Sequence, residues 1–205
     1  MIFNNSLREE NRMKKIVITG GPCAGKSTVI EAIAEEFGNR VVVVPEVATA
    51  LFEAGFPPPN PWTQEWQDAL QAAIIVGQYR FEARAEAEAR DNGCQIIICD
   101  RGILDGAAYL QGGVEEFCGR FDVDEGEILS RYEAVIHLES LSTLDPELYR
   151  ELAKSNPSRF EDIAMAEERE LNLRRAWSGH KNRMHLSADI EASTGRVREI
   201  INRNL

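Results

Sequence analysis

Residues 20–28 carry the chemical groups that a polyphosphate needs. They read Gly-Gly-Pro-Cys-Ala-Gly-Lys-Ser-Thr, which is a glycine, four further residues and then Gly-Lys-Ser. Glycines allow backbone N–H groups to turn toward phosphate oxygens without clashes from Cβ atoms. Lys26 supplies a charge for the β- and γ-phosphates, Ser27 a hydroxyl for Mg²⁺, and Thr28 a hydroxyl near the α-phosphate. The predicted nucleoside triphosphate site therefore comprises Gly20, Gly21, Pro22, Cys23, Ala24, Gly25, Lys26, Ser27 and Thr28.

Asp100 directly follows an apolar run, Ile96–Cys99, that is typical of a buried strand. In open α/β folds ligands bind at the carboxyl ends of the strands, so Asp100 is expected at the site. We predict a carboxylate that holds Mg²⁺ through water or accepts a proton from an attacking hydroxyl. The alternative is a cap for the helix that follows, and Asp105 is a weaker candidate of the same kind.

Arg101 and Glu46 are two further candidates at that edge of the sheet. The planar guanidinium of Arg101 is suited to an acceptor oxygen or a phosphate, and an ion pair with Asp100 or a nearby glutamate is the alternative. Glu46 follows the apolar run 41–44, so its carboxylate is expected to deprotonate or orient the acceptor. A solvated surface glutamate is the alternative interpretation.

A charged helical segment in the last third of the chain, about residues 155–178, is predicted to act as a lid. Phosphoryl transfer spreads negative charge over the transferred group, and arginines from a closing lid stabilise it. Arg159 and Arg174 are our candidates, although helical surfaces often carry such charges without a function. His180 and His185 are interpreted as structural or surface residues.

Strands and helices alternate along the chain, which predicts a parallel sheet in a three-layer α/β fold. A rigid, non-helical loop is expected at residues 52–61, which contain four prolines, and it is a candidate substrate wall, with Phe56, Trp62 and Trp66 as aromatic groups for stacking or core packing. The apolar stripe of the long helix is expected at Trp66, Leu70, Ala73, Ile74, Gly77 and Phe81. Strands are expected at residues 16–18, 41–44, 96–99, 134–138 and, least clearly, 183–187, and helices at 30–37, 62–90 and 190–202.

Composition restricts the class of protein. The 205 residues suit one domain, and a net charge of -11 argues against binding nucleic acid through phosphate contacts. No apolar stretch reaches membrane-spanning length, and the four cysteines lack metal-ligand spacing, so we expect reduced thiols, a cytoplasmic location and no membrane partner. Residues 1–13 are expected to be a disordered extension, before a single ATP-binding domain at 14–205.

Four segments together resemble a known group of proteins: GGPCAGKST, VVVVPEVA, IIICDRG and NPSRFEDIAMAEERELNLRRAW. They are similar to the AAA-type small ATP-binding P-loop family related to the ribosylnicotinamide kinase domain, and more distantly to thymidylate and deoxynucleoside kinases. The resemblance implies a five-stranded parallel sheet of nucleoside/nucleotide-kinase type with a helical lid and an ATP site at residues 20–28. It also implies an acceptor site between Glu46, the long helix and Asp100-Arg101. Deoxynucleoside kinases carry Glu-Pro and Asp-Arg-Ser where this chain has Pro45-Glu46 and Asp100-Arg101-Gly102.

Two functions are compatible with these residues. The first is an ATP- and Mg²⁺-dependent phosphotransferase that acts on a small-molecule acceptor such as a nucleoside, a nucleotide or a ribosylated base, with a homodimer left open. The second is a regulatory ATPase that acts through a protein partner. An Asn-Lys-x-Asp motif for guanine is absent, which disfavours a GTPase switch. A degenerate domain that only binds nucleotide is disfavoured because Lys26, Ser27 and Asp100 are all present.

Overall fold

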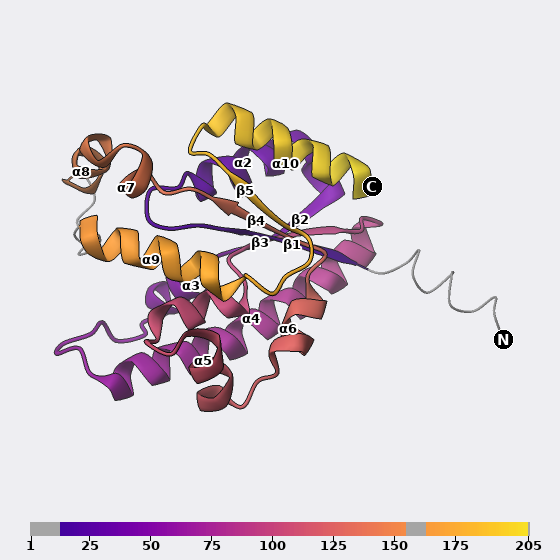
Figure 1. Cartoon of the computed structure of the whole chain (residues 1–205). Helices are drawn as coiled ribbons and strands as arrows, with labels where there is room; N and C mark the ends of the chain where they lie inside the picture. The colour runs from indigo at the N-terminus through magenta and orange to yellow at the C-terminus, as the bar shows by residue number, and fades with distance from the viewer. Residues whose placement is uncertain (1–12, 155–162, 205) are drawn as a thin grey trace.

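One five-stranded, all-parallel sheet organises the chain (Figure 1). The computed structural model describes residues 13–154 and 163–204. The strand order is β2-β3-β1-β4-β5, so β1 is central and is paired with β3 and β4. The strands are β1 (Lys14–Thr19), β2 (Val41–Val44), β3 (Ile96–Asp100), β4 (Ala134–Leu138) and β5 (Arg183–Leu186).

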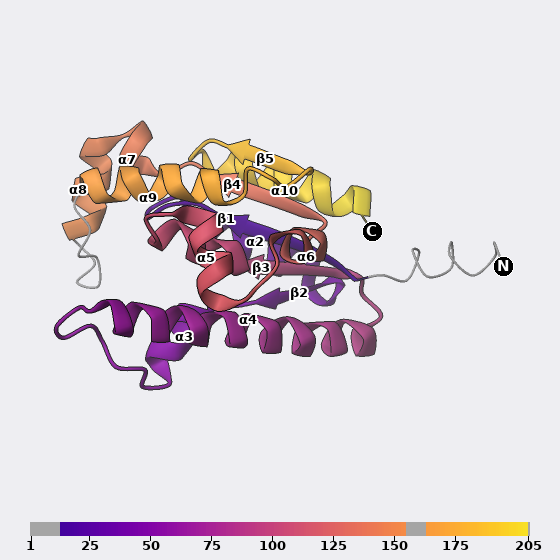
Figure 2. The ribbon, with the colours of Figure 1, turned by 60° about the horizontal axis from the view of Figure 1, so that its bottom comes forward.

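Helices cover both faces of the sheet, which gives three layers (Figures 1 and 2). One face carries α2 (Lys26–Phe37) and α10 (Ile190–Asn204). The opposite face carries α4 (Gln64–Asn92), the 3₁₀ helix η2 (Ile103–Tyr109), α5 (Gly113–Phe121), α6 (Glu125–Arg131) and α9 (Ile163–Ala176). The shorter helices are η1 (Gly38–Arg40), α3 (Val47–Glu53), α7 (Leu141–Leu144) and α8 (Pro146–Lys154).

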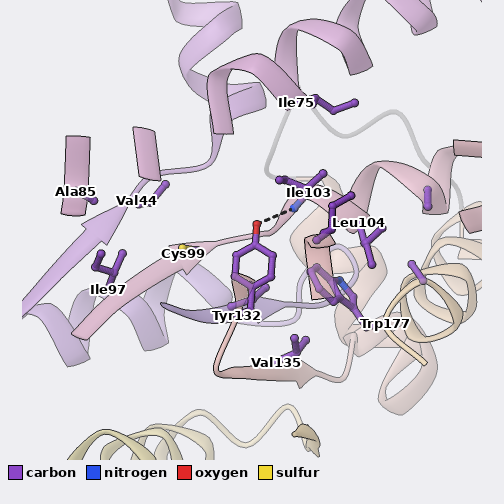
Figure 3. Close-up of a cluster of buried hydrophobic side chains, with 14 of the residues drawn as sticks. Val44, Ile75, Ala85, Ile97, Cys99, Ile103, Leu104, Tyr132, Val135 and Trp177 are labelled. Atoms are coloured by element: carbon purple, nitrogen blue, oxygen red, sulfur yellow. Dashed lines mark hydrogen bonds between the residues drawn. The ribbon is translucent and has the colours of Figure 1, made fainter. Parts of the chain in front are cut away.

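Successive strand residues supply the two cores alternately, because neighbouring side chains on a strand point to opposite faces. In β1, Val17 belongs to the core under α4 and α9, whereas Ile16 and Ile18 belong to the core under α2 and α10. Tyr132 and Trp177 fill the first core with their rings 5.5 Å apart, and the Tyr132 hydroxyl accepts the backbone N–H of Ile103 at 3.3 Å (Figure 3). Both faces of the central strands are therefore buried away from solvent, which explains their apolar runs.

The predicted fold class is confirmed, including the number of strands and their parallel arrangement. The expected strands 41–44 and 134–138 coincide with β2 and β4. One expectation is wrong at its start: residues 52 and 53 end helix α3, so the non-helical loop begins only after Glu53. The alanines and leucine of residues 48–51 favour a helix and extend it past the proline at its entrance.

The expected apolar stripe on α4 is confirmed at Leu70, which is buried, and at Phe81, which packs against the core, but not at the other four positions. Trp66, Ala73, Ile74, Gly77 and Phe81 are only half-buried, and of the six predicted residues Leu70 alone is fully buried. The inward face instead includes four polar residues: Gln67, Gln71, Gln78 and Glu82. Hydrophobicity could not indicate this face, because polar partners from β1, from α6 and from Arg101 after β3 satisfy part of it.

Glu82 is the centre of those polar contacts. Its carboxylate pairs with Lys15 Nζ at 2.9 Å and with Arg131 at 2.6 Å, and it accepts the Tyr132 hydroxyl at 2.7 Å. Gln78 Nε2 lies 3.1 Å from Glu82 Oε1 and 3.3 Å from the Arg101 carbonyl. This network connects the middle of α4 to the residue that follows β3.

Among the helices of residues 13–154 and 163–204, none has the length and apolar character needed to cross a membrane.

Candidate functional site

The predicted phosphate-binding loop joins the end of β1 to the start of α2, at the carboxyl edge of the sheet. Gly20 has φ +148°, and a Cβ there would lie 2.2 Å from the Leu138 carbonyl oxygen. Gly25 has φ +77°, and a Cβ there would lie 2.1 Å from Ile190 Cδ1. Only glycine fits these two positions, so the loop conformation follows from the motif and from the packing of β4 and α10 around it.

Lys26 begins α2 and folds back over the loop. Its Nζ donates to the carbonyls of Gly20 at 3.0 Å and Gly21 at 3.1 Å. Burial lowers the pKa of Lys26 to about 8, and the charge of Arg101 acts in the same direction, while Asp100 and Glu46 oppose both. The ammonium is thus held inside the concave side of the loop by weak carbonyl acceptors, which a phosphate oxygen would replace.

Asp100 ends β3 beside this loop, and its Oδ1 is buried without a hydrogen-bond partner. Burial and the charge of Glu46 raise the pKa of Asp100 to about 6, although Lys26 and Arg101 act against the rise. An orphaned carboxylate oxygen beside a phosphate loop fits the environment of a Mg²⁺ ion with its water shell. Ser27 is exposed at the first turn of α2, where its hydroxyl is available.

Within the described part of the chain, no group of three or more His, Cys, Asp or Glu side chains is placed to hold a metal alone. A Mg²⁺ ion here would therefore depend on phosphate oxygens as well as on Ser27 and Asp100. That dependence is the usual behaviour of Mg²⁺, which keeps several waters and binds through one or two carboxylates plus substrate phosphates. The donor set thus fits a nucleotide-bound metal.

Arg101 and Glu46 form an ion pair, with Nε of Arg101 2.5 Å from Oε1 of Glu46. The second guanidinium branch of Arg101 lies 3.4 Å from the Gly20 carbonyl and 3.3 Å from Asp105 Oδ1. Although burial raises the pKa of Glu46, the charge of Arg101 and the Thr49 hydroxyl at 2.6 Å outweigh it, and the pKa falls to about 2. Glu46 is therefore ionised at any physiological pH, as half of a preformed pair beside the phosphate loop.

Asp105 stabilises this arrangement through several hydrogen bonds. The sequence alone indicated only a weak helix-start candidate at this position. It is 4% exposed and accepts the Thr19 hydroxyl, the Gly102 N–H at 3.0 Å and the Trp177 indole N–H at 3.0 Å. One carboxylate thus connects β1, η2 and the end of α9. Its helix-start role is present as well, because Gly102 is the residue that precedes η2.

The proline-containing loop connects α3 to α4 beyond this edge (Figure 2). Phe56 packs edge-on against Phe52 and Trp66, with ring centroids 6.1 and 6.3 Å apart. The Trp66 indole donates to the Pro57 carbonyl at 2.8 Å, so this ring stabilises the loop. Trp62 is 58% exposed and is the one ring of the three candidates that presents a large free surface.

Of the two predicted lid arginines, Arg159 and Arg174, the structure describes only the second. Arg159 lies outside the described residues. Arg174, in the last turn of α9, pairs with Glu139 and, at 3.1 Å, with Glu170. Its neighbour Arg169 stacks over the Tyr109 ring at 3.9 Å and donates to the Ala108 carbonyl, so α9 contacts η2 beside the candidate site.

Two further polar residues escaped sequence reasoning. Glu170 in α9 accepts the Gly21 N–H at 2.9 Å and lies 2.7 Å from Nε2 of His137, which is buried in β4. Burial raises the pKa of Glu170, but the bonds from His137, Gly21 and Arg174 outweigh it and lower the pKa below its usual value. Gly21 and Glu170 are 149 residues apart in the sequence, so no local pattern indicates their contact. His180 is structural as expected: it lies 3.0 Å from the Tyr132 carbonyl, whereas His185 is exposed.

Comparison with known proteins places this site in context. Residues 15–192 match the model of a protein family described as an AAA domain. No curated protein matches the sequence. Many solved structures are similar to this chain in fold, among them a thymidylate kinase from Candida albicans, with a TM-score of 0.64 and 17% sequence identity over 94% of this chain and 92% of that one. The chain is thus similar to that enzyme in fold.

Proposed function

Since the chain belongs to this AAA domain family, we propose that it is an ATP- and Mg²⁺-dependent phosphotransferase that acts on a small-molecule acceptor. A nucleoside, a nucleotide or a ribosylated base is the favoured acceptor class. The observation that carries the proposal is the preformed Glu46–Arg101 pair, which stands beside a complete phosphate loop and is itself anchored to the Gly20 carbonyl.

The nucleotide is bound by the chain's own donors. Loop N–H groups and the start of α2 cradle the phosphates, and Lys26 leaves the carbonyls of Gly20 and Gly21 to contact the terminal phosphates. Ser27 and Asp100 would hold Mg²⁺, which when bound neutralises charge that develops on the phosphates. The unpartnered Oδ1 of Asp100 supports this assignment.

Glu46 orients the acceptor hydroxyl in this mechanism, and Arg101 fixes Glu46. A carboxylate with a pKa of about 2 is a weak base, but it is a strong hydrogen-bond acceptor. Phosphoryl transfer through a loose transition state demands little early removal of the hydroxyl proton, so orientation is the larger need. As the new O–P bond forms and the bond between the γ-phosphorus and ADP breaks, the hydroxyl becomes strongly acidic and passes its proton to the Glu46 carboxylate, which releases it to water.

The test is phosphoryl transfer from Mg·ATP to a panel of nucleosides, nucleoside monophosphates and ribosylnicotinamide, with phosphorylated products followed by mass. We expect acceptor-dependent product from the wild-type chain and none from Lys26→Ala. Release of ADP and free phosphate that no acceptor stimulates would instead identify the chain as a regulatory ATPase.

The role of Glu46 predicts that its loss reduces kcat/KM for the acceptor far more than it weakens the binding of Mg·ATP. Glu46→Gln should lower kcat/KM for the acceptor by about 100-fold, because the orienting charge is lost, while the Kd for Mg·ATP changes by less than about threefold. Glu53→Gln, on the exposed end of the same helix α3, is the matched control and should behave as wild type. Transfer at the wild-type rate by Glu46→Gln would rule out this role.

A further inference from the structure

Glu170 makes a contact with the phosphate loop that the proposed function does not use. It is 2% exposed, and its Oε2 accepts the Gly21 N–H at 2.9 Å. Its Oε1 lies 2.7 Å from His137 Nε2 and accepts from Arg174 Nε at 3.1 Å. The carboxylate therefore joins three elements: α9, β4 and the loop after β1.

The loop approaches α9 so closely at this point that Gly21 has no room for a side chain. A Cβ at Gly21 would lie 2.8 Å from Glu170 Oε2 and 3.1 Å from Ser140 Cβ. Ser140, which follows β4, also donates its hydroxyl to the Pro22 carbonyl. The second and third residues of the loop are thus held from outside by two side chains from the last third of the fold.

A buried carboxylate is an unexpected neighbour for a loop that binds an anion, because the two negative charges repel each other. The charge of Arg174, which also pairs with Glu139, reduces that repulsion, and His137 lies within hydrogen-bond distance of the same carboxylate. The fixed conformation of the loop supplies the gain in free energy that offsets the repulsion that remains between Glu170 and a bound phosphate. A loop fixed before the ligand arrives loses less conformational entropy when it binds.

We propose that Glu170 is a positioning residue for the phosphate loop: through its bond to the Gly21 N–H it holds the loop in the conformation that binds the triphosphate. His137 and Arg174 hold the Glu170 carboxylate in turn. The proposal rests on the proposed function in one respect, namely that residues 20–28 bind Mg·ATP. The proposal does not depend on which acceptor the chain phosphorylates.

The first experiment measures Mg·ATP binding by calorimetry, without an acceptor. Glu170→Ala should weaken binding by about 10- to 100-fold, the range for loss of a hydrogen bond to a charged group. Glu170→Gln, which keeps one oxygen for the Gly21 N–H, should recover part of that loss. Glu168→Ala, on the exposed face of the same helix, should bind as wild type. Wild-type affinity in Glu170→Ala would overturn the proposal.

A double-mutant cycle separates positioning from general destabilisation. Gly21→Ala alone should weaken Mg·ATP binding, because the new methyl group meets Glu170. In Gly21→Ala/Glu170→Ala the closest collision, with Glu170 Oε2, is removed and the 3.1 Å approach to Ser140 Cβ remains, so the double variant should bind more tightly than the product of the two single effects predicts. Loss of a Glu170 that only stabilises the fold would lower the free energy of unfolding but leave the Kd of the folded protein for Mg·ATP unchanged, and that result would overturn the proposal. If Glu170→Ala fails to fold, Mg·ATP binding is measured on Glu170→Gln alone, which should bind more weakly than wild type; wild-type affinity in that variant would overturn the proposal.

The two proposals fail in different ways. Wild-type protein that binds Mg·ATP but phosphorylates no acceptor would refute the phosphotransferase, and the binding constants of the cycle would still decide the role of Glu170. Wild-type protein that binds no Mg·ATP would refute both.

Discussion

Asp100 and Glu46 are two carboxylates at one edge of the sheet, and their surroundings give them opposite properties. Glu46 faces Arg101 and Thr49, which hold its pKa near 2. Asp100 is desolvated and lies beside the charge of Glu46, so its pKa rises to about 6. Pairs of titratable groups whose pKa values are driven apart are typical of functional sites.

The raised pKa of Asp100 predicts a stability effect with a defined sign. The folded state holds a proton on Asp100 that the unfolded state, with a pKa near 3.8, has released. Stability without ligand therefore falls as pH rises from about 4 to about 6. Asp100→Asn removes this penalty, so it should be more stable than wild type at pH 7.5 and similar at pH 4, as measured by urea unfolding. Asp91→Asn, at the exposed end of α4, is the control.

The same substitution should damage ligand binding. We expect Asp100→Asn to weaken Mg²⁺-dependent ATP binding by at least about tenfold, since one charged oxygen of the proposed metal site is lost. In the wild type, Mg²⁺-dependent binding should decline as pH falls through about 6, because Asp100 becomes protonated. An unchanged Mg²⁺ titration curve in Asp100→Asn would exclude Asp100 as a metal-site residue.

Helix α4 is the element that links the core to the site. Its polar inward residues place Gln78 against the Arg101 carbonyl and Glu82 against Lys15, Arg131 and Tyr132. Arg101 has φ +69°, a conformation that an arginine rarely adopts, and its N–H donates to the Ile18 carbonyl at 3.0 Å. The contacts from α4 and β1 thus hold a strained backbone that aims the guanidinium at Glu46.

Loss of Glu82 should therefore be severe. Glu82→Ala leaves Lys15 and Arg131 beside a cavity without their carboxylate, and breaking a buried ion pair in this way destabilises by about 3–5 kcal/mol. Glu88→Ala, on the exposed side of the same helix, should change the free energy of unfolding by less than about 0.5 kcal/mol. Chemical denaturation of both variants measures the difference. Equal stabilities would show that the network contributes little.

At the scale of the whole molecule, the nucleotide site is a junction of distant segments. The loop after β1 is packed by Leu138 of β4, Ile190 of α10 and Glu170 of α9. A ligand in this loop therefore stabilises contacts that run from the first strand to the last helix (Figure 1). Binding that favours the folded state over the unfolded state raises stability by mass action.

A thermal shift follows from that coupling. Mg·ATP at about 100 times its Kd should stabilise the chain by about 2.7 kcal/mol, which raises Tm by about 5–10 °C for a domain of this size. Lys26→Ala should have a Tm near that of wild type without ligand and show almost no shift with Mg·ATP. A shift of wild-type size in Lys26→Ala would mean that ATP binds somewhere other than the phosphate loop.

The amino-acid sequence by itself determined the phosphate loop, the strand runs and the α/β class, because each depends on residues close together in the chain. The glycines around Lys26 and the apolar runs that end at Pro45 and at Asp100 are local patterns with a physical meaning. Local patterns also placed Glu46 and Arg101 at the same edge of the sheet.

Only the tertiary structure decided which of these residues contact one another. Arg101 pairs with Glu46 across 55 residues, Thr19 bonds to Asp105 across 86, and Gly21 to Glu170 across 149. The polar inward face of α4 depended on it as well, since Gln78 and Glu82 are buried only because charged and polar partners from other elements reach them. Such pairings are long-range, and their energy depends on burial and charge that no short stretch of sequence contains.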